Sequence, residues 1–88
     1  LNPFHIVHGG LIFALGDTAM GVKIKSLGKT AVTMNANINF ISPGVGKYLI
    51  ANAKVIKNGS HTCVMEATIK NDLGKLVATM NGTYFYIK

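Results

Sequence analysis

A histidine and two glycines stand together at His8-Gly9-Gly10; Asp17 follows seven residues later, and Asn2 precedes the histidine by six. We expect the glycines to be the first residues of an apolar helix, where uncrowded backbone N–H groups lie at the positive end of the helix macrodipole. A developing oxyanion needs donors of this kind. Asp17 is the only ionisable side chain between this histidine and the next lysine. The pattern predicts an acyl-transfer site.

The composition is typical of one small domain. Of the 88 residues, 49% are hydrophobic and 14% are charged. A chain this short buries only about 60% of its unfolded surface, which favours a core completed by a second copy. No stretch approaches the roughly 20 apolar residues of a membrane span, so we expect no membrane association. No secretory signal is visible and Cys63 has no second cysteine to pair with, so we expect a cytoplasmic location and a Cys63 that packs in the core.

The net charge is +6 and comes from lysine without arginine. Because the lysines are scattered and no aromatic RNA-binding signature accompanies them, we expect no nucleic-acid partner. The same charge favours small anionic ligands, including phosphate-bearing ones, although a solubilising role accounts for most of these lysines equally well. No group of histidine, cysteine and carboxylate residues has metal-ligand spacing, so no metal is expected.

The apolar pattern predicts one helix followed by four strands. Apolar residues recur at nearly helical spacing from Gly10 to about Lys25, with Gly28 as the stop. The repeating positions are Leu11, Ala14, Leu15, Ala19 and Val22. Alternation predicts strands over residues 30–41, 47–57, 61–70 and 75–87, with Thr33 on the polar face of the first. Asn58-Gly59 predicts a hairpin. A helix followed by an antiparallel meander indicates the α+β class, with the helix packed across one face of the sheet.

Three runs of this sequence resemble the PaaI-like acyl-CoA thioesterases of the hotdog fold. They are residues 2–10, 15–21 and 37–43. The resemblance covers nearly all of the chain and implies a hotdog fold in one domain, residues 1–88, which lacks the N-terminal segment usual in the family. It also implies hydrolysis of an acyl-CoA thioester to free coenzyme A and a carboxylic acid. Coenzyme A is then part of the substrate, and no separate cofactor is expected.

The resemblance gives five residues a catalytic role. Asp17 acts as general base or as nucleophile on the thioester carbonyl, and the Gly9 N–H holds the oxyanion. Asn2 orients the water or the carbonyl. His8 positions the loop or donates to the thioester, and Thr33 matches the position that helps to hold the attacking water.

Geometry indicates that two chains share this site. Gly9 and Asp17 lie roughly 12 Å apart along a helix axis, too far for both to touch one thioester carbon. Gly10, Ala14, Asp17 and Gly21 share one helical face, on which small side chains let a partner helix approach. We therefore expect a homodimer or a tetramer of dimers. The residues expected to bind the substrate and its coenzyme A portion are Gly10, Lys57, Asn58, Gly59 and Ser60.

Two other functions remain open from the sequence. One is a noncatalytic acyl-CoA-binding module, and the other is a hotdog dehydratase or hydratase, although the Pro-rich signature of the dehydratases is absent. The acyl group is not specified, because Phe13, Met20, Met34 and Tyr48 would line an aliphatic or an aryl pocket equally well.

Overall fold

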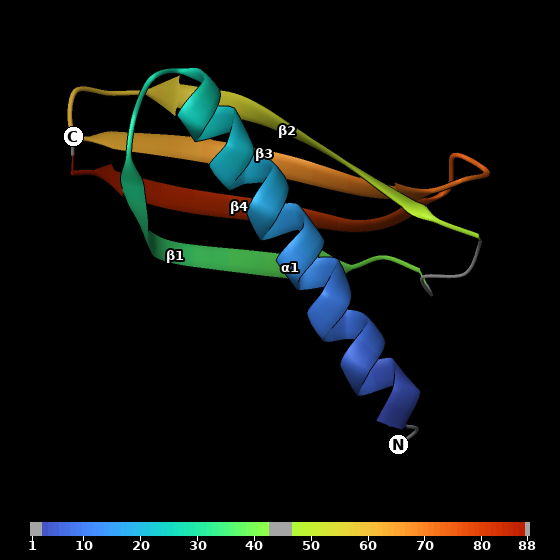
Figure 1. Cartoon of the computed structure of the whole chain (residues 1–88). Helices are drawn as coiled ribbons and strands as arrows, with labels where there is room; N and C mark the ends of the chain where they lie inside the picture. Colours follow the sequence, from blue (N-terminus) through green and yellow to red (C-terminus); the bar gives the residue numbers. More distant parts are fainter. Residues whose placement is uncertain (1–2, 43–46, 88) are drawn as a thin grey trace.

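The computed structural model describes the backbone of residues 3–42 and 47–87, and side chains from Gly9 onward within those ranges. Its elements in chain order are α1 Pro3–Ser26, β1 Ala31–Phe40, β2 Leu49–Asn58, β3 Thr62–Asn71 and β4 Leu76–Tyr86. The four strands form one antiparallel sheet, and α1 crosses one of its faces (Figure 1). The predicted α+β class and the packing of the helix across the sheet are confirmed.

The order of strands in the sheet is β1-β4-β3-β2. Only the last three strands form the expected meander. The prediction of a four-stranded meander was wrong, because β1 pairs with β4 and the chain crosses to the opposite edge before it forms β2. Consequently β1 and β2 are the two edge strands of this sheet, and β3 and β4 lie at its centre.

Helix α1 begins seven residues earlier than its apolar periodicity predicted. It starts at Pro3 rather than about Gly10. Proline is favoured at the first helical position, since its fixed φ suits the helix and its missing N–H is not needed there. The end was predicted well, because Gly28 adopts a φ of 75° and donates its N–H to the Lys25 carbonyl at 2.9 Å. Glycine accepts this left-handed conformation without strain.

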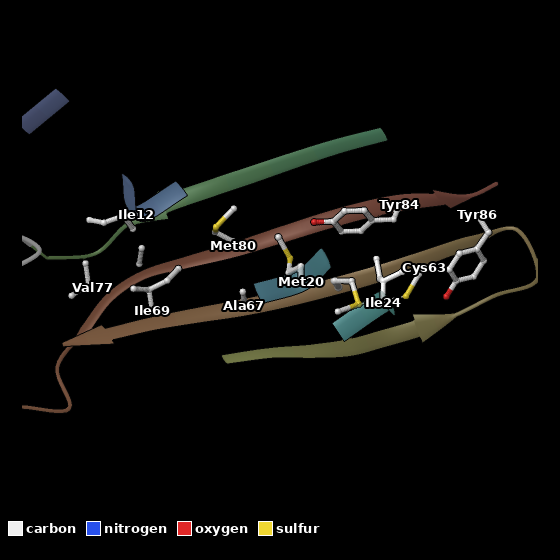
Figure 2. Close-up of a cluster of buried hydrophobic side chains, with 12 residues drawn as sticks. Ile12, Met20, Ile24, Cys63, Ala67, Ile69, Val77, Met80, Tyr84 and Tyr86 are labelled. Atoms are coloured by element: carbon white, nitrogen blue, oxygen red, sulfur yellow. Dashed lines mark hydrogen bonds between the residues drawn. The ribbon is translucent and has the colours of Figure 1, made fainter. Parts of the chain in front are cut away.

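One stripe of α1 faces the sheet and builds the core with β3 and β4. Figure 2 shows Ile12, Met20 and Ile24 against side chains of these strands, and each is at most 3% exposed. The sequence had suggested another stripe, yet Leu11 and Val22 are each 62% exposed. Apolar residues surround much of this helix, so periodicity alone does not choose its buried face. Cys63 is fully buried, as expected.

A bulge in β1 reverses the orientation predicted for Thr33. The register between β1 and β4 shifts within residues 33–35, so that Thr33 lies opposite Tyr84 while Ile38 lies opposite Met80. Directly paired residues point to the same face, and Tyr84 and Met80 both belong to the core beneath α1. Thr33 therefore lies on the helix side of the sheet. The predicted polar face was wrong at this position because the extra residue shifts the alternation by one.

Gly16 allows α1 to approach the sheet closely. A Cβ at Gly16 would overlap the Met80 sulfur and lie 3.2 Å from Ile69 Cδ1, whereas a Cβ at Gly21 would meet nothing within 4 Å. Both glycines are interior to the helix, so alanine raises helix propensity equally at each. We expect Gly16→Ala to lower the free energy of unfolding relative to Gly21→Ala by about 1–3 kcal/mol, measured by urea denaturation. Equal stability of the two variants would contradict this packing.

Candidate active site

Asp17 lies near the middle of α1 on the flank that faces β4. Its side chain is half-buried. The phenol of Tyr84 on β4 donates a hydrogen bond of 3.0 Å to Asp17 Oδ1. One carboxylate oxygen is therefore engaged by the sheet, which fixes the side chain of a residue that the sequence marked as the central catalytic group.

Tyr84 is a site residue that the sequence analysis missed. It is only 4% exposed, and burial raises its pKa well above the usual range. The Asp17 carboxylate raises this pKa further, whereas the neighbouring Thr33 hydroxyl opposes the rise. The phenol thus stays protonated and serves as a donor to Asp17 at neutral pH. The sequence signal that could have revealed Tyr84 is a tyrosine at a core-facing position of a strand, because a buried phenol needs a polar partner.

Gly9 is the seventh residue of α1 rather than the opening of the helix. Its N–H lies beyond the first four N–H groups, which are the ones that lack a partner within a helix. A Cβ at Gly9 would lie 3.4 Å from Phe40 Cζ, so this glycine sits over the end of β1. The oxyanion role of Gly9 stays a prediction. It requires the first turns of α1 to unwind, or the helix to begin later than in this structure, so that the Gly9 N–H has no partner within the helix.

The single chain does not bring Gly9 and Asp17 together. Both belong to one continuous helix, in which eight residue steps correspond to roughly 12 Å. Gly9 adjoins Phe40 at the end of β1, whereas Asp17 contacts Tyr84, whose strand partner Thr33 lies near the start of β1. The backbone of His8 lies in α1 beside Gly9. Asn2 lies outside the described residues. The roles of His8 and Asn2 stay predictions.

The predicted hairpin is present. Strand β2 ends at Asn58, and the Gly59 N–H donates to the Thr62 carbonyl at 2.8 Å. Asn58 Oδ1 accepts a hydrogen bond of 2.6 Å from the phenol of Tyr86, so its side chain has a structural contact. The Ser60 hydroxyl lies 3.0 Å from His61 Nδ1 and is exposed. Gly59 and Ser60 thus form a tight turn at one end of the sheet.

The lysine beside this hairpin faces away from the helix. A second bulge, within residues 55–57, places Lys57 opposite Val64. The neighbours of Val64 on β3, Cys63 and Met65, are both buried on the helix side. Lys57 therefore projects from the other face of the sheet, as does Lys54, which pairs with Glu66. Gly10 lies on the open side of α1, where a Cβ would meet nothing within 4 Å. The binding roles of these residues are untested.

A cavity of about 280 Å³ opens beside Tyr84, between the C-terminal half of α1 and the start of β1 (the Tyr84 cavity). Its lining consists of Thr18, Gly21, Val22, Ile24, Lys25, Lys29, Thr30, Ala31 and Tyr84. Tyr84 bonds Asp17 and also lines this space, so the cavity begins next to the carboxylate. The pocket residues suggested by the sequence do not line it. Met20 is fully buried, while Met34 and Tyr48 are each 58% exposed.

Two further properties concern the described residues alone. Over residues 3–42 and 47–87, no helix combines the length and the apolar character that crossing a bilayer requires. Among the described side chains, those of residues 9–42 and 47–87, no three of histidine, cysteine, aspartate or glutamate gather where they would hold a metal ion.

Comparisons with known proteins agree with this fold. A family model described as Thioesterase superfamily matches residues 4–78. The acyl-coenzyme A thioesterase PaaI of Escherichia coli is 39% identical over 93% of this chain and 59% of its own length. A Bacillus halodurans protein whose crystal structure was determined with CoA has 38% sequence identity and a TM-score of 0.89, covering 99% of this chain and 63% of that one.

A hypothetical thioesterase from Streptococcus pneumoniae, determined with coenzyme A, has 34% identity and a TM-score of 0.83, covering 90% of this chain and 62% of that one. Its structure is also known for two variants, in which alanine replaces an aspartate or a threonine.

The chain belongs to the Thioesterase superfamily, and its helix on a four-stranded antiparallel sheet is the hotdog fold of those thioesterases. It is PaaI-like, as the resemblance implied. The chain spans about three fifths of the length of the relatives described above.

Proposed function

We propose that this protein hydrolyses acyl-CoA thioesters, with Asp17 as the general base. The observation that carries the proposal is the half-buried Asp17 carboxylate, held by Tyr84 beside a cavity in a thioesterase-family fold. The relative PaaI from Escherichia coli is an acyl-coenzyme A thioesterase, and two of the similar structures were determined with coenzyme A. These relatives support the same substrate class here.

The proposed reaction needs only water and the thioester. Asp17 takes a proton from a water molecule, whose oxygen attacks the carbonyl carbon. The carbonyl oxygen becomes an oxyanion, for which Gly9 N–H is the proposed donor. When the carbonyl re-forms, the carbon–sulfur bond breaks and coenzyme A leaves with the proton that Asp17 had taken. The other product is the carboxylic acid, and coenzyme A enters only as part of the substrate.

The pneumococcal variants support the choice of Asp17 and Thr33. The aspartate and the threonine replaced in that thioesterase are separated along its chain by the same number of residues as Asp17 and Thr33 here. Tyr84 bonds Asp17 and is the direct strand partner of Thr33. The bulge that reversed the expected orientation of Thr33 puts it on the same face of the sheet as Tyr84, which supports its proposed role in the site.

We propose that the active unit is a homodimer, or a tetramer of dimers, in which Gly9 of one chain meets Asp17 of another. The separation of Gly9 and Asp17 within one helix supports this arrangement. The face shared by Gly10, Ala14, Asp17 and Gly21 is open at both glycines, so a partner helix can approach closely. His8 and Asn2 are proposed to complete each site from the chain that supplies Gly9.

A panel of acyl-CoA and acyl-pantetheine thioesters tests the proposed reaction. We expect the purified protein to release free thiol from at least one member of the panel. The released thiol is measured by its reaction with a thiol-specific dye. A dehydratase or hydratase would instead change the absorbance of an enoyl thioester and release no thiol. A binding module would bind the thioesters, measured by calorimetry, and leave them intact. Either of those two results would contradict the proposal.

Lys57 and the adjoining hairpin are proposed to bind the phosphates of coenzyme A, because an ammonium group and the exposed Ser60 hydroxyl suit a phosphate. We expect Lys57→Ala to raise KM for acyl-CoA with little change in kcat, and to leave an acyl-pantetheine unaffected since it lacks the nucleotide. Lys75→Ala, at the far hairpin between β3 and β4, is the matched control. Equal effects on both substrates, or none on either, would remove Lys57 from the binding site.

A further inference from the structure

The phenol of Tyr84 joins β4 to the helix. It donates to Asp17 Oδ1 on α1 at 3.0 Å. The direct strand partner of Tyr84 is Thr33 on β1, on the same face of the sheet. The bulge in β1 places Thr33 there, because without the extra residue Thr33 would point to the opposite face of the sheet.

The charge of the acceptor fixes the direction of the hydrogen bond between Tyr84 and Asp17. An ionised Asp17 carboxylate can only accept, so Tyr84 donates to it. The phenol has one proton, so that proton is committed to the carboxylate.

We infer that Tyr84 is a positioning residue for the catalytic carboxylate: it fixes Asp17 Oδ1 and leaves Oδ2 as the oxygen that takes the proton from water. This inference rests on the proposed function. A carboxylate on a helix otherwise has free rotation about its side-chain bonds, and a hydrogen bond to a charged group is among the stronger ones. Fixing one oxygen selects one direction of attack.

Tyr86 provides a matched comparison on the same strand. Both phenols lie on the helix side of β4 and are largely buried, with Tyr84 4% and Tyr86 9% exposed (Figure 2). The Tyr86 hydroxyl bonds Asn58 instead of a carboxylate. The neighbouring Cys63 thiol and burial raise the pKa of Tyr86 to about 12. Phenylalanine at either position removes one hydroxyl from the same core, but only Tyr84→Phe frees Asp17.

The kinetic test compares these variants with the wild type on a hydrolysed thioester. We expect Tyr84→Phe to lower kcat about tenfold or more, with KM changed little, because a hydrogen bond to a charged group is lost. Tyr86→Phe should keep a nearly normal kcat even if both variants lose similar stability.

A second test does not depend on activity. The ¹³Cζ signal of labelled Tyr84, assigned with Tyr84→Phe, reports the hydrogen bonding of its phenol. At neutral pH, Asp17→Asn should shift this signal, because a neutral acceptor replaces a charged one, and should leave that of Tyr86 in place. Thermal unfolding of each variant verifies that the comparison is made on folded protein.

The outcomes separate the inference from the proposed function. Should the wild type hydrolyse no thioester, the proposed function fails and the positioning role fails with it. Should the wild type be active while Tyr84→Phe keeps its kcat, the proposed function stands and the inference alone is overturned. An active wild type in which Asp17→Asn leaves the Tyr84 ¹³Cζ signal unmoved at neutral pH would also overturn it, since the contact would then be absent in solution.

Discussion

Asp17→Asn is expected to lower kcat for thioester hydrolysis by about a hundredfold or more, because loss of a general base typically costs this much. Asparagine keeps the shape of the side chain, and its amide oxygen can still accept the hydrogen bond from Tyr84. The asparagine amide, unlike a carboxylate, does not take a proton from water at neutral pH. Binding of a nonhydrolysable acyl-CoA analogue, measured by calorimetry, should remain close to that of the wild type.

Asp72→Asn is the matched control for this change. Asp72 lies in the turn between β3 and β4, where its Oδ1 accepts a hydrogen bond of 3.1 Å from the backbone N–H of Lys47. An amide oxygen can make the same contact, so kcat should be almost unchanged. Near-normal turnover by a folded Asp17→Asn protein would remove Asp17 from the proposed mechanism.

Mixing two inactive variants is expected to restore activity if the site is shared. Asp17→Asn protomers keep Gly9, whereas Gly9→Pro protomers keep Asp17 and lose the N–H that proline lacks. In a mixed dimer, one site then has both groups intact and the other has neither. Random mixing makes half of the dimers mixed, so about a quarter of the wild-type activity should return. Thiol release after unfolding and refolding the two variants together measures it.

Proline at position 9 also perturbs α1, because Gly9 is the seventh residue of this helix. Circular dichroism and sedimentation of the refolded mixture therefore accompany the assay. Mixed dimers that form, keep their helix and remain inactive would contradict a shared site. So would an active monomer observed by sedimentation at the assay concentration.

The positions of the strands along the sequence were predicted better than the face that each element turns toward the core. Each strand was placed within two residues, since alternation and turn residues mark the ends of strands clearly. The start of α1 and its buried face were missed. Gly9 and Gly10 suggested a boundary, while Pro3 in fact opens the helix. Apolar residues such as Leu11 lie on both sides of α1, so only packing on the sheet selects the face of Ile12.

In the candidate site, too, the residue marked by a local sequence pattern was predicted, whereas residues whose roles depend on tertiary contacts were missed or misplaced. Asp17 stood out because a lone carboxylate interrupts an apolar helix, and the structure gives it a buried hydrogen-bond partner. Tyr84 was missed because its role depends on the packing of α1 over β4, which no local spacing encodes. Thr33 was assigned to the wrong face because a bulge leaves no mark in the alternation of residue types.

A single turnover in ¹⁸O-labelled water tests most directly whether Asp17 activates water to cleave a thioester. With enzyme in excess over a hydrolysed acyl-CoA, mass spectrometry should find one free coenzyme A for each acid formed. The label should appear in the released acid and not in the peptide that contains Asp17, because a general base takes a proton and forms no bond to the acyl group. Label in the Asp17 peptide with an unlabelled acid would contradict the base and make Asp17 a nucleophile; an acyl-CoA that stays intact would contradict the hydrolysis itself.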